Sequence, residues 1–460
     1  MEKVFKLIKP KPLTEKVQSR DATIYMYRVM KIIGWIPPRK GPMRYLYRLW
    51  TCIPFFFGAI YLPIMFGLSY FIEFKDFSPG EFLTSLQVAI NVYGTAIKCT
   101  ILYVQLWRLE ETENVLDQLD KRRQSEADRQ RIHAMVAKCN YVFLIFAIVY
   151  GTYVTSTFLS AVFMGRPPYK VYNPYFKYSD GKGFLWAQSV FEFAIMLFAV
   201  YQDELSDTYM LVYMIIFRAH LDILRHHIEN LRLDPSKNGN EHYEDLVNCI
   251  VEHKMIIDCC NWIRPIMQKT IFVQFLLIGI VLGLTLINIF FFSDLFSGIS
   301  SSFFLLAVLM ETFPFCYCCN LLIDDCDNLS EALFQSKWVN AEPRYKSTLI
   351  HFMHNLQKPI AFIAGGIIPI TLNSNISVVS FNAEPRYKST LIHFMHNLQK
   401  PIAFIAGGII PITLNSNISV VWVIKTSISK YKVFAIFQVA KFAFSIITIV
   451  REMNLAEKFK

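Results

Sequence analysis

The chain has 460 residues, a formal net charge of +10, and 54% hydrophobic residues against 18% charged ones. This composition excludes an ordinary set of soluble domains and indicates a membrane protein. The positive charge could suit nucleic acid, but its Lys and Arg residues cluster beside apolar runs, where anionic lipid explains them better. We therefore expect the lipid bilayer, and no nucleic acid, as the partner of the basic segments.

Three charge-free apolar runs set the fold class. They contain 24, 27 and 24 residues and cover Leu49–Ile72, Cys139–Gly165 and Thr270–Ser293. Each run exceeds the roughly 20 residues that a helix needs to cross a bilayer core. The sequence thus predicts an all-α, polytopic membrane protein.

In chain order, six transmembrane helices are predicted, and a seventh is assembled from the last quarter of the chain. The six spans cover about residues 44–72, 79–107, 138–164, 184–217, 265–292 and 303–323. The basic amino-terminal stretch has no compact apolar core, so we expect no removable signal peptide.

Basic residues set the predicted orientation. Residues 1–48 carry twelve Lys or Arg against three acidic residues, and the predicted inner loops 108–138 and 218–269 carry seven Lys or Arg each. The predicted outer loops carry one, four and none. By the positive-inside rule, the amino terminus is cytoplasmic, and seven spans leave the carboxyl terminus extracellular.

Several polar groups invite a functional interpretation. Glu192 lies in an otherwise apolar span, which by default suggests function. For Asp203 to Asp207 we expect a helix that continues beyond the membrane, and for the Pro- and Tyr-rich loop 165–183 a compact extracellular lid. The histidines between 218 and 264 lack metal-ligand spacing and are expected on helix surfaces. Cys316, Cys318 and Cys319 are expected to pack in apolar surroundings, so we predict no metal and no cofactor.

The last quarter contains an exact duplication. Residues 340–379 recur without one change at 382–421, so the duplicated unit spans 340–381 and 382–421. Solenoid repeats diverge and need about three copies, so we interpret two identical copies as a recent duplication or a gene-model error. Residues 421–439, with Lys425, Lys430 and Lys432, interrupt the final apolar helix, and we interpret them as intron-derived. Removing 42 and 19 residues leaves 399.

Four stretches carry a resemblance to a known family. They are HLDILRHHIENLR from His220, CIVEHKMIIDCC from Cys249, LLIDDCDNLSEALFQSKW from Leu321, and QKPIAFIAGGIIPITLNSNISV followed later by AKFAFSIITIVREMN. Together they resemble the insect odorant receptor family, specifically the ligand-tuning subunits of flies.

That resemblance implies an odorant-gated, non-selective cation channel in the plasma membrane of olfactory sensory neuron dendrites. The partners it implies are a co-receptor subunit, in a heterotetramer, and small volatile odorants. Residues 1–323 would hold the cytoplasmic amino terminus, six spans and the ligand pocket, and residues 324–460 the cytoplasmic anchor and the pore helix. The anchor half of segment seven matches Glu384–Phe404 and equally Glu342–Phe362.

Volatile ligands carry few polar groups, so their affinity must come from burying apolar surface against aromatic side chains. This burial contributes about 25 cal/mol per Å². The family implies a pocket in the outer half of spans two to four and six. We expect ligand contacts from nine residues: Val88, Asn91, Tyr150, Tyr153, Thr157, Phe158, Gln188, Phe191 and Ile195.

The same family match implies the gate. An apolar ring that closes the pore by dewetting falls on Ile449, with Ser445, Thr448 and Glu452 facing the same path. Glu452 either draws cations to the mouth or is a solvated helix end.

Other classes of membrane protein fit the sequence less well. A gustatory-type chemoreceptor of the same superfamily would show Thr-Tyr and Gln-Phe in its last helix, and these are absent. A metabotropic seven-helix receptor has the opposite orientation. A transporter should show two similar halves, and an enzyme needs a convergent polar constellation, which the spacing does not give.

Overall fold

The computed structural model describes residues 6–38, 41, 43–122, 125–175, 181–291, 295–357 and 360–371. The chain divides into two compact units, which are described separately. One comprises Met1–Phe74, Val88–Phe275 and Val308–Asn375, and the other comprises Lys75–Gln87, Leu276–Ala307 and Ile376–Lys460. The predicted gate at Ser445, Thr448, Ile449 and Glu452, the second copy of the repeat and the insert lie outside the described residues.

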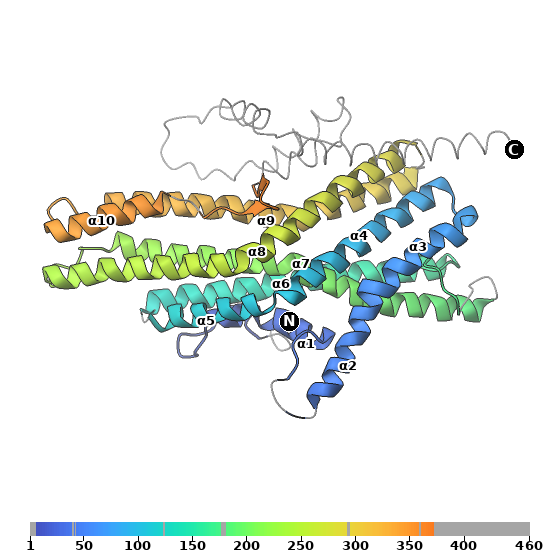
Figure 1. Ribbon diagram of the computed structural model, residues 1–460, viewed down its shortest axis with the longest axis horizontal. Coiled ribbons are helices and arrows are strands. Elements are labelled where there is room, and N and C mark those ends of the chain that lie inside the picture. Colours follow the sequence, from blue (N-terminus) through green and yellow to red (C-terminus); the bar gives the residue numbers. More distant parts are fainter. Residues whose placement is uncertain are drawn as a thin grey trace. The chain divides into compact units, whose positions relative to one another are not determined.

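The described residues are almost entirely helical (Figure 1). The α-helices are α1 (Ile24–Ile33), α2 (Met43–Phe55), α3 (Leu62–Ile72), α4 (Pro79–Val104), α5 (Trp107–Arg122), α6 (Glu126–Phe163), α7 (Lys182–Glu229), α8 (Gly239–Phe291), α9 (Leu295–Gln335) and α10 (Pro343–Leu356). Two 3₁₀ turns cover Ser19–Thr23 and Phe74–Asp76, and a π-helical turn covers Phe56–Tyr61. Strands β1 (Ile363–Ala364) and β2 (Ile368–Pro369) pair antiparallel, with Ile363 opposite Pro369.

Within the described residues, four segments are long and apolar enough to cross a membrane: Arg44–Ile72, Glu126–Phe163, Lys182–Glu229 and Gly239–Thr285. They contain the predicted spans one, three and four, and most of span five. Helices α4 and α9 cover most of predicted span two and all of span six. The helical membrane class is thereby supported, whereas the count of seven spans and the orientation of the termini stay predictions.

The first span is a helix interrupted by a π-helical turn between α2 and α3. Pro54 lies inside α2, and Pro63 lies in the first turn of α3. Proline lacks an N–H group, so each of these prolines leaves a carbonyl of the preceding turn without its helical donor. The carbonyl of Pro54 itself, just before the π-helical turn, accepts a hydrogen bond from Gln202 Nε2 of α7 at 3.3 Å. The interrupted span is thereby tied to α7.

Helix α7 is the central helix of the first unit. Between Leu205 and Phe217 every residue is buried, polar ones included, so this stretch has no solvent-facing stripe. A helix that is apolar all round is expected in a core. It pairs antiparallel with α6, because Tyr150 contacts Asp207 towards the middle of both helices, whereas Asp128 at the start of α6 contacts His227 at the end of α7.

The polar segment 218–264 corrects the expectation of surface histidines. His220 and His253 are buried, at 1% and 8% exposure. His227 bridges Asp128 through Nε2 (2.9 Å) and Glu252 through Nδ1 (3.2 Å). These two carboxylates raise the pKa of His227 to about 9. Spacing along one helix could not reveal this burial, because the covering residues come from other helices.

In the second unit, one contact joins α8 to α4 and another lies at the start of α4. Asn288 Nδ2 of α8 donates a hydrogen bond to Thr84 Oγ1 of α4 at 3.3 Å. The rings of Phe77 and Phe82 meet edge to face with centroids 6.4 Å apart.

Candidate ligand-binding site

An apolar cluster joins four helices, α3, α4, α6 and α7, and the loop after α6. Its buried members come from α3 and α4 (Leu62, Phe66, Ala89 and Val92), from α6 and the loop (Val154, Tyr169 and Val171), and from α7 (Ile195, Met196, Ala199 and Val200). Partly buried aromatic side chains pack around it: Phe57, Tyr61, Tyr70, Tyr150, Phe191 and Phe193. The cluster is thus an apolar, aromatic-walled region of the kind that binds small apolar ligands.

A small cavity of about 10 Å³ lies in this cluster. That volume is about what one water needs, far below the roughly 300–1,000 Å³ of ordinary ligand pockets. Its lining comes from α3 and the preceding turn, from the loop, and from α7: Tyr61, Leu62, Val171, Tyr172, Asn173, Phe191, Glu192 and Ile195. The site is therefore closed in this structure.

Aromatic side chains fill the space that a ligand would need. The ring of Phe191 meets Phe57 and Tyr61 edge to face, with centroids 6.3 Å and 6.0 Å apart. Phe57 and Tyr61 themselves lie 5.5 Å apart. Such pairs contribute about 0.5–1.5 kcal/mol each beyond their buried area, a cost that a ligand binding among them would have to offset.

Glu192 holds the loop over the cluster. Its buried carboxylate accepts the backbone N–H of Tyr169 at 2.9 Å and the side-chain amide of Gln188 at 3.0 Å. A buried carboxylate is tolerated when hydrogen bonds satisfy it. Since Tyr169 and Val171 are themselves buried in the cluster, this carboxylate fixes the part of the loop that covers the cavity.

The structure brings together some of the nine predicted contact residues. Val88, Tyr150, Phe191 and Ile195 belong to the cluster or pack against it, and Phe191 and Ile195 line the cavity.

The other predicted residues lie around this group. Gln188 donates a hydrogen bond to Glu192, which lines the cavity. The ring of Phe158 is tilted by 40° against that of Phe193, with centroids 4.8 Å apart. Thr157 donates its hydroxyl to the carbonyl of Tyr153 within α6, and Tyr153 is 43% exposed. Asn91 is half-buried on α4. Whether any of the nine touches a ligand stays a prediction.

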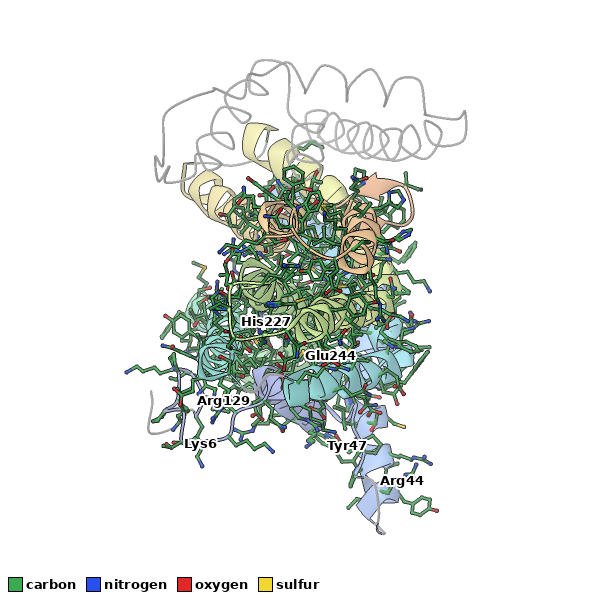
Figure 2. The ribbon with its side chains drawn as sticks, turned by 90° about the vertical axis from the view of Figure 1, so that its left-hand side faces the viewer. Lys6, Arg44, Tyr47, Arg129, His227 and Glu244 are labelled. Carbon is green, nitrogen blue, oxygen red and sulfur yellow. The ribbon has the colours of Figure 1, made fainter. Side chains whose placement is uncertain are left out.

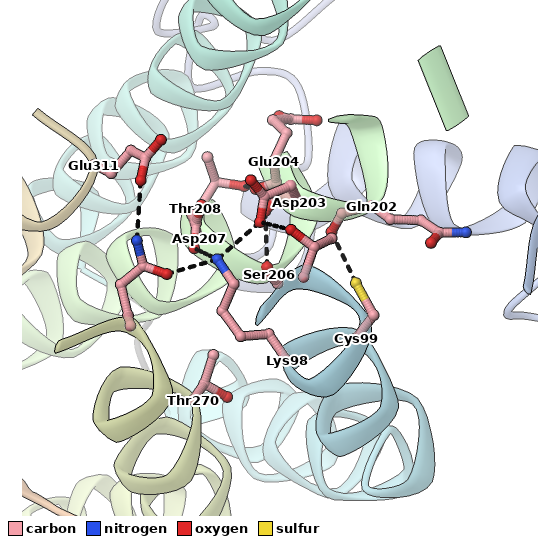
Figure 3. A network of polar contacts seen from close by, with 12 residues as sticks. Lys98, Cys99, Gln202, Asp203, Glu204, Ser206, Asp207, Thr208, Thr270 and Glu311 are labelled. Carbon is pink, nitrogen blue, oxygen red and sulfur yellow. Dashed lines mark hydrogen bonds and ion pairs between the residues drawn. The ribbon is translucent and has the colours of Figure 1, made fainter. Parts of the chain in front are cut away.

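Beside the cluster lies a buried charge network centred on Lys98 of α4 (Figure 3). The Lys98 side chain is 2% exposed, and its Nζ contacts Asp203 at 2.8 Å, Asp207 at 2.7 Å and Gln274 at 2.7 Å. An ammonium group has three N–H donors, so these three acceptors satisfy it. The network therefore ties α4 to α7 and α8.

Two further contacts extend the network. Gln274 Nε2 donates to Glu311 Oε2 of α9 at 3.0 Å, and the Tyr150 hydroxyl donates to Asp207 Oδ2 at 3.0 Å. Tyr150 thus packs against the apolar cluster and also bonds to the ion pair. A change in the cluster that moves Tyr150 would act directly on Asp207.

Sequence reasoning missed Lys98, Tyr61 and Phe57. A lone Lys in an apolar span was the available signal for Lys98, because such a charge must be paired. No local signal separates Tyr61 or Phe57 from the other aromatics of the run PFFFGAIY. Asp203 and Asp207 lie on a helix that continues past the apolar run, as predicted, and the structure adds their pairing with Lys98. That this helix leaves the bilayer there stays a prediction.

Comparison with known proteins agrees with this architecture. The profile of the 7tm odorant receptor family matches residues 78–382 and 381–424. Odorant receptor 59b of Drosophila melanogaster is 53% identical over 457 residues, covering 99% of this chain and 100% of the relative. Odorant receptor 42b of the same fly is 47% identical over 457 residues, covering 99% of each.

A solved structure shares the fold. The insect olfactory receptor OR5 from Machilis hrabei matches with a TM-score of 0.63 at 14% identity, covering 83% of this chain and 98% of that one. Its complex with eugenol matches with a TM-score of 0.65 at 17% identity, covering 82% and 99%. Given the family match over most of its length and these close relatives, the chain belongs to the 7tm odorant receptor family.

Proposed function

We propose that the chain is the ligand-binding subunit of an odorant-gated, non-selective cation channel. It forms a heterotetramer with a co-receptor subunit in the plasma membrane of olfactory sensory neuron dendrites. The observation that carries the proposal is the aromatic-walled cavity lined by Tyr61, Phe191 and Ile195. Family membership supports it, as does the shared fold with an olfactory receptor solved with eugenol.

Ligand binding opens this cavity by separating the rings of Phe57, Tyr61 and Phe191. A volatile molecule that buries about 200 Å² of apolar surface gains about 5 kcal/mol at 25 cal/mol per Å². That gain offsets the loss of two or three aromatic contacts at about 0.5–1.5 kcal/mol each. Small, flat and mostly apolar odorants suit such a site best, because they would pack between aromatic rings such as those of Tyr61 and Phe191 and aliphatic side chains such as that of Ile195.

Tyr150 couples the site to the rest of the bundle. Its hydroxyl bonds to Asp207 at 3.0 Å, and Asp207 pairs with Lys98 at 2.7 Å. A hydrogen bond to a charged group contributes about 1.5–3 kcal/mol. Displacing the Tyr150 ring therefore changes the energy of the ion pair that joins α4 to α7.

At the pore, we propose that Ile449 forms the apolar constriction, with Ser445, Thr448 and Glu452 on the same path. A ring of this kind gates by excluding water when closed. The functional chain has the 399-residue form without one repeat unit and without residues 421–439.

One comparison supports the removal of one repeat unit. The family profile matches in two segments, 78–382 and 381–424, which overlap where the two copies join.

The experiment is co-expression with an insect odorant co-receptor and whole-cell recording against an odorant panel. The 460-residue and 399-residue chains are compared, each with and without the co-receptor. We expect odorant-evoked, G-protein-independent cation current from the shorter chain with the co-receptor. Silence of that pair to every odorant would refute the proposal.

Two alternatives give different outcomes in the same cells. A gustatory-type chemoreceptor would respond to non-volatile tastants without the odorant co-receptor. A metabotropic receptor would expose an amino-terminal epitope on intact cells, and its currents would be blocked by a non-hydrolysable GDP analogue.

A further inference from the structure

A second, larger cavity lies beside α1 and takes no part in the ligand site. Its volume is about 1140 Å³, and its walls come from α1 and the turn before it, the start of α2, and α5. Neither the proposed odorant site nor the charge network around Lys98 includes a residue of this cleft.

The cleft is lined by four basic side chains: Arg20, Arg28, Lys31 and Arg44. Arg20 is engaged, since it pairs with Asp117 at 3.0 Å and Glu113 at 3.7 Å. Arg28, Lys31 and Arg44 are exposed, and among the described residues no carboxylate pairs with them. The Arg28 guanidinium lies over the Tyr25 ring at 5.1 Å, a contact that does not neutralise its charge, so the cleft holds three cations without an acidic partner among the described residues.

The acidic residues of the cleft offset this charge only in part. Asp21 accepts the backbone N–H of Gln18 at 2.9 Å, and Glu113 accepts the Thr23 hydroxyl at 2.9 Å as well as pairing with Arg20. Glu110 is the remaining lining acid, and it is exposed. Three unpaired cations against one such carboxylate favour an anionic ligand.

Hydrogen bonds fix the cleft at the beginning of the first span. The last turn of α1 presents carbonyls that have no partner within the helix. Three side chains of α2 supply the donors: Tyr47 to Lys31 O at 2.5 Å, Trp50 to Ile32 O at 2.7 Å and Thr51 to Gly34 O at 2.5 Å. Arg44 and Tyr47 follow each other along the first turns of α2 (Figure 2). The end of α1 is therefore held where the candidate span Arg44–Ile72 starts.

An apolar surface continues from the cleft along the span. Leu46, Leu49 and Ile53 of α2 are exposed, and Ile32 at the end of α1 is 66% exposed. A ligand that satisfies both surfaces has an anionic head and an apolar tail. Basic and aromatic residues in this order are also typical of a membrane interface.

We propose that this cleft binds an anionic phospholipid. Its phosphate-bearing headgroup lies against Arg28, Lys31 and Arg44, and its acyl chains run along the exposed face of α2. The interaction is specific to the cleft, because the three cations line it together, from two helices that hydrogen bonds hold to each other.

The test uses the purified full-length chain in neutral detergent micelles and native mass spectrometry. The probes are phosphatidylinositol 4,5-bisphosphate, phosphatidylserine, phosphatidylcholine and soluble inositol trisphosphate. The variant Arg28→Gln/Lys31→Gln/Arg44→Gln removes the cations of the cleft. A matched control, Lys6→Gln/Lys16→Gln/Lys254→Gln, removes the same charge elsewhere, and Arg28→Lys/Lys31→Arg/Arg44→Lys keeps the charge of the cleft.

We expect the two anionic lipids to be retained by the wild type, the control and the charge-keeping variant. Because each cation near an anionic lipid contributes about 1 kcal/mol, affinity should fall on the order of 100-fold in the cleft variant. Equal retention by the cleft variant, or an equal loss in the control, would overturn the proposal. Inositol trisphosphate binding as tightly as the lipid would also overturn it, since the cleft would then recognise a free phosphate. Size-exclusion profiles identify any variant that fails to fold, and the charge-keeping variant then decides the outcome.

Discussion

Replacement of Lys98 by Met perturbs the charge network most sharply. The substitution keeps an apolar stem of similar size but removes the ammonium group that contacts Asp203 at 2.8 Å, Asp207 at 2.7 Å and Gln274 at 2.7 Å. Removing one partner of a buried ion pair costs about 3–5 kcal/mol, because the other charge is left without compensation. We expect Lys98→Met to destabilise the folded receptor by about this amount.

The assay is the thermal unfolding of the purified chain, followed by fluorescence-detected size-exclusion chromatography. Lys254→Met serves as the control, since Lys254 is exposed on α8. The variant Lys98→Met/Asp203→Asn/Asp207→Asn removes the stranded charges together with the ammonium group, and most of the lost stability should return. The reasoning is refuted if Lys98→Met unfolds at the wild-type temperature, or if the triple variant is no more stable than the single one.

Three further perturbations have expected outcomes. Tyr150→Phe removes the hydroxyl that donates to Asp207 at 3.0 Å. A hydrogen bond to a charged group contributes about 1.5–3 kcal/mol, so this variant should shift odorant dose–response curves about tenfold or more while surface expression persists. Unchanged curves would contradict the coupling. Gly34→Ala places a Cβ 2.9 Å from the backbone of α2 at a φ of +98°, and it should lower the free energy of unfolding by about 1–3 kcal/mol. The control Gly183→Ala, whose Cβ meets nothing within 4 Å, should be neutral in the same unfolding assay. His227 has a folded-state pKa of about 9 against an ordinary 6.5. Its contribution to the stability of the folded chain is therefore full below pH 6.5 and is lost as the pH rises through 9. If His227→Gln lowered the unfolding temperature by the same amount throughout this range, the result would contradict the prediction.

Local sequence pattern predicted the helices well. The charge-free run 49–72 lies in α2 to α3, the run 139–165 lies in α6 and the start of its loop, and the run 270–293 lies in α8 up to residue 291. Helix length and apolarity are properties of consecutive residues, so they can be predicted from the sequence. The extension of α7 beyond its apolar run was also predicted correctly. The break in the helix between α4 and α5 near Gln105 was not predicted, because no Pro or Gly marks it.

Long-range pairing could not be read in the same way. Lys98 meets acids more than 100 residues away on α7, and His227 meets Asp128 from α6, so no spacing along one helix reveals either contact. A charge in an apolar span predicts that a partner exists but does not identify it. For the ligand site, the family resemblance supplied the spans, and the structure supplied the loop contact through Glu192 and the closed ring of aromatics.

The most direct test of the account is the odorant dose–response current of the 399-residue chain, co-expressed with the co-receptor, for Phe191→Ala and Val190→Ala. Phe191 lines the closed cavity, whereas the neighbouring Val190 is 51% exposed. We predict that Phe191→Ala shifts the half-maximal concentration about tenfold or more, as expected for an aromatic contact and its buried area, and that Val190→Ala leaves it unchanged. Wild-type responses of Phe191→Ala to every active odorant would contradict the placement of the ligand site among these helices.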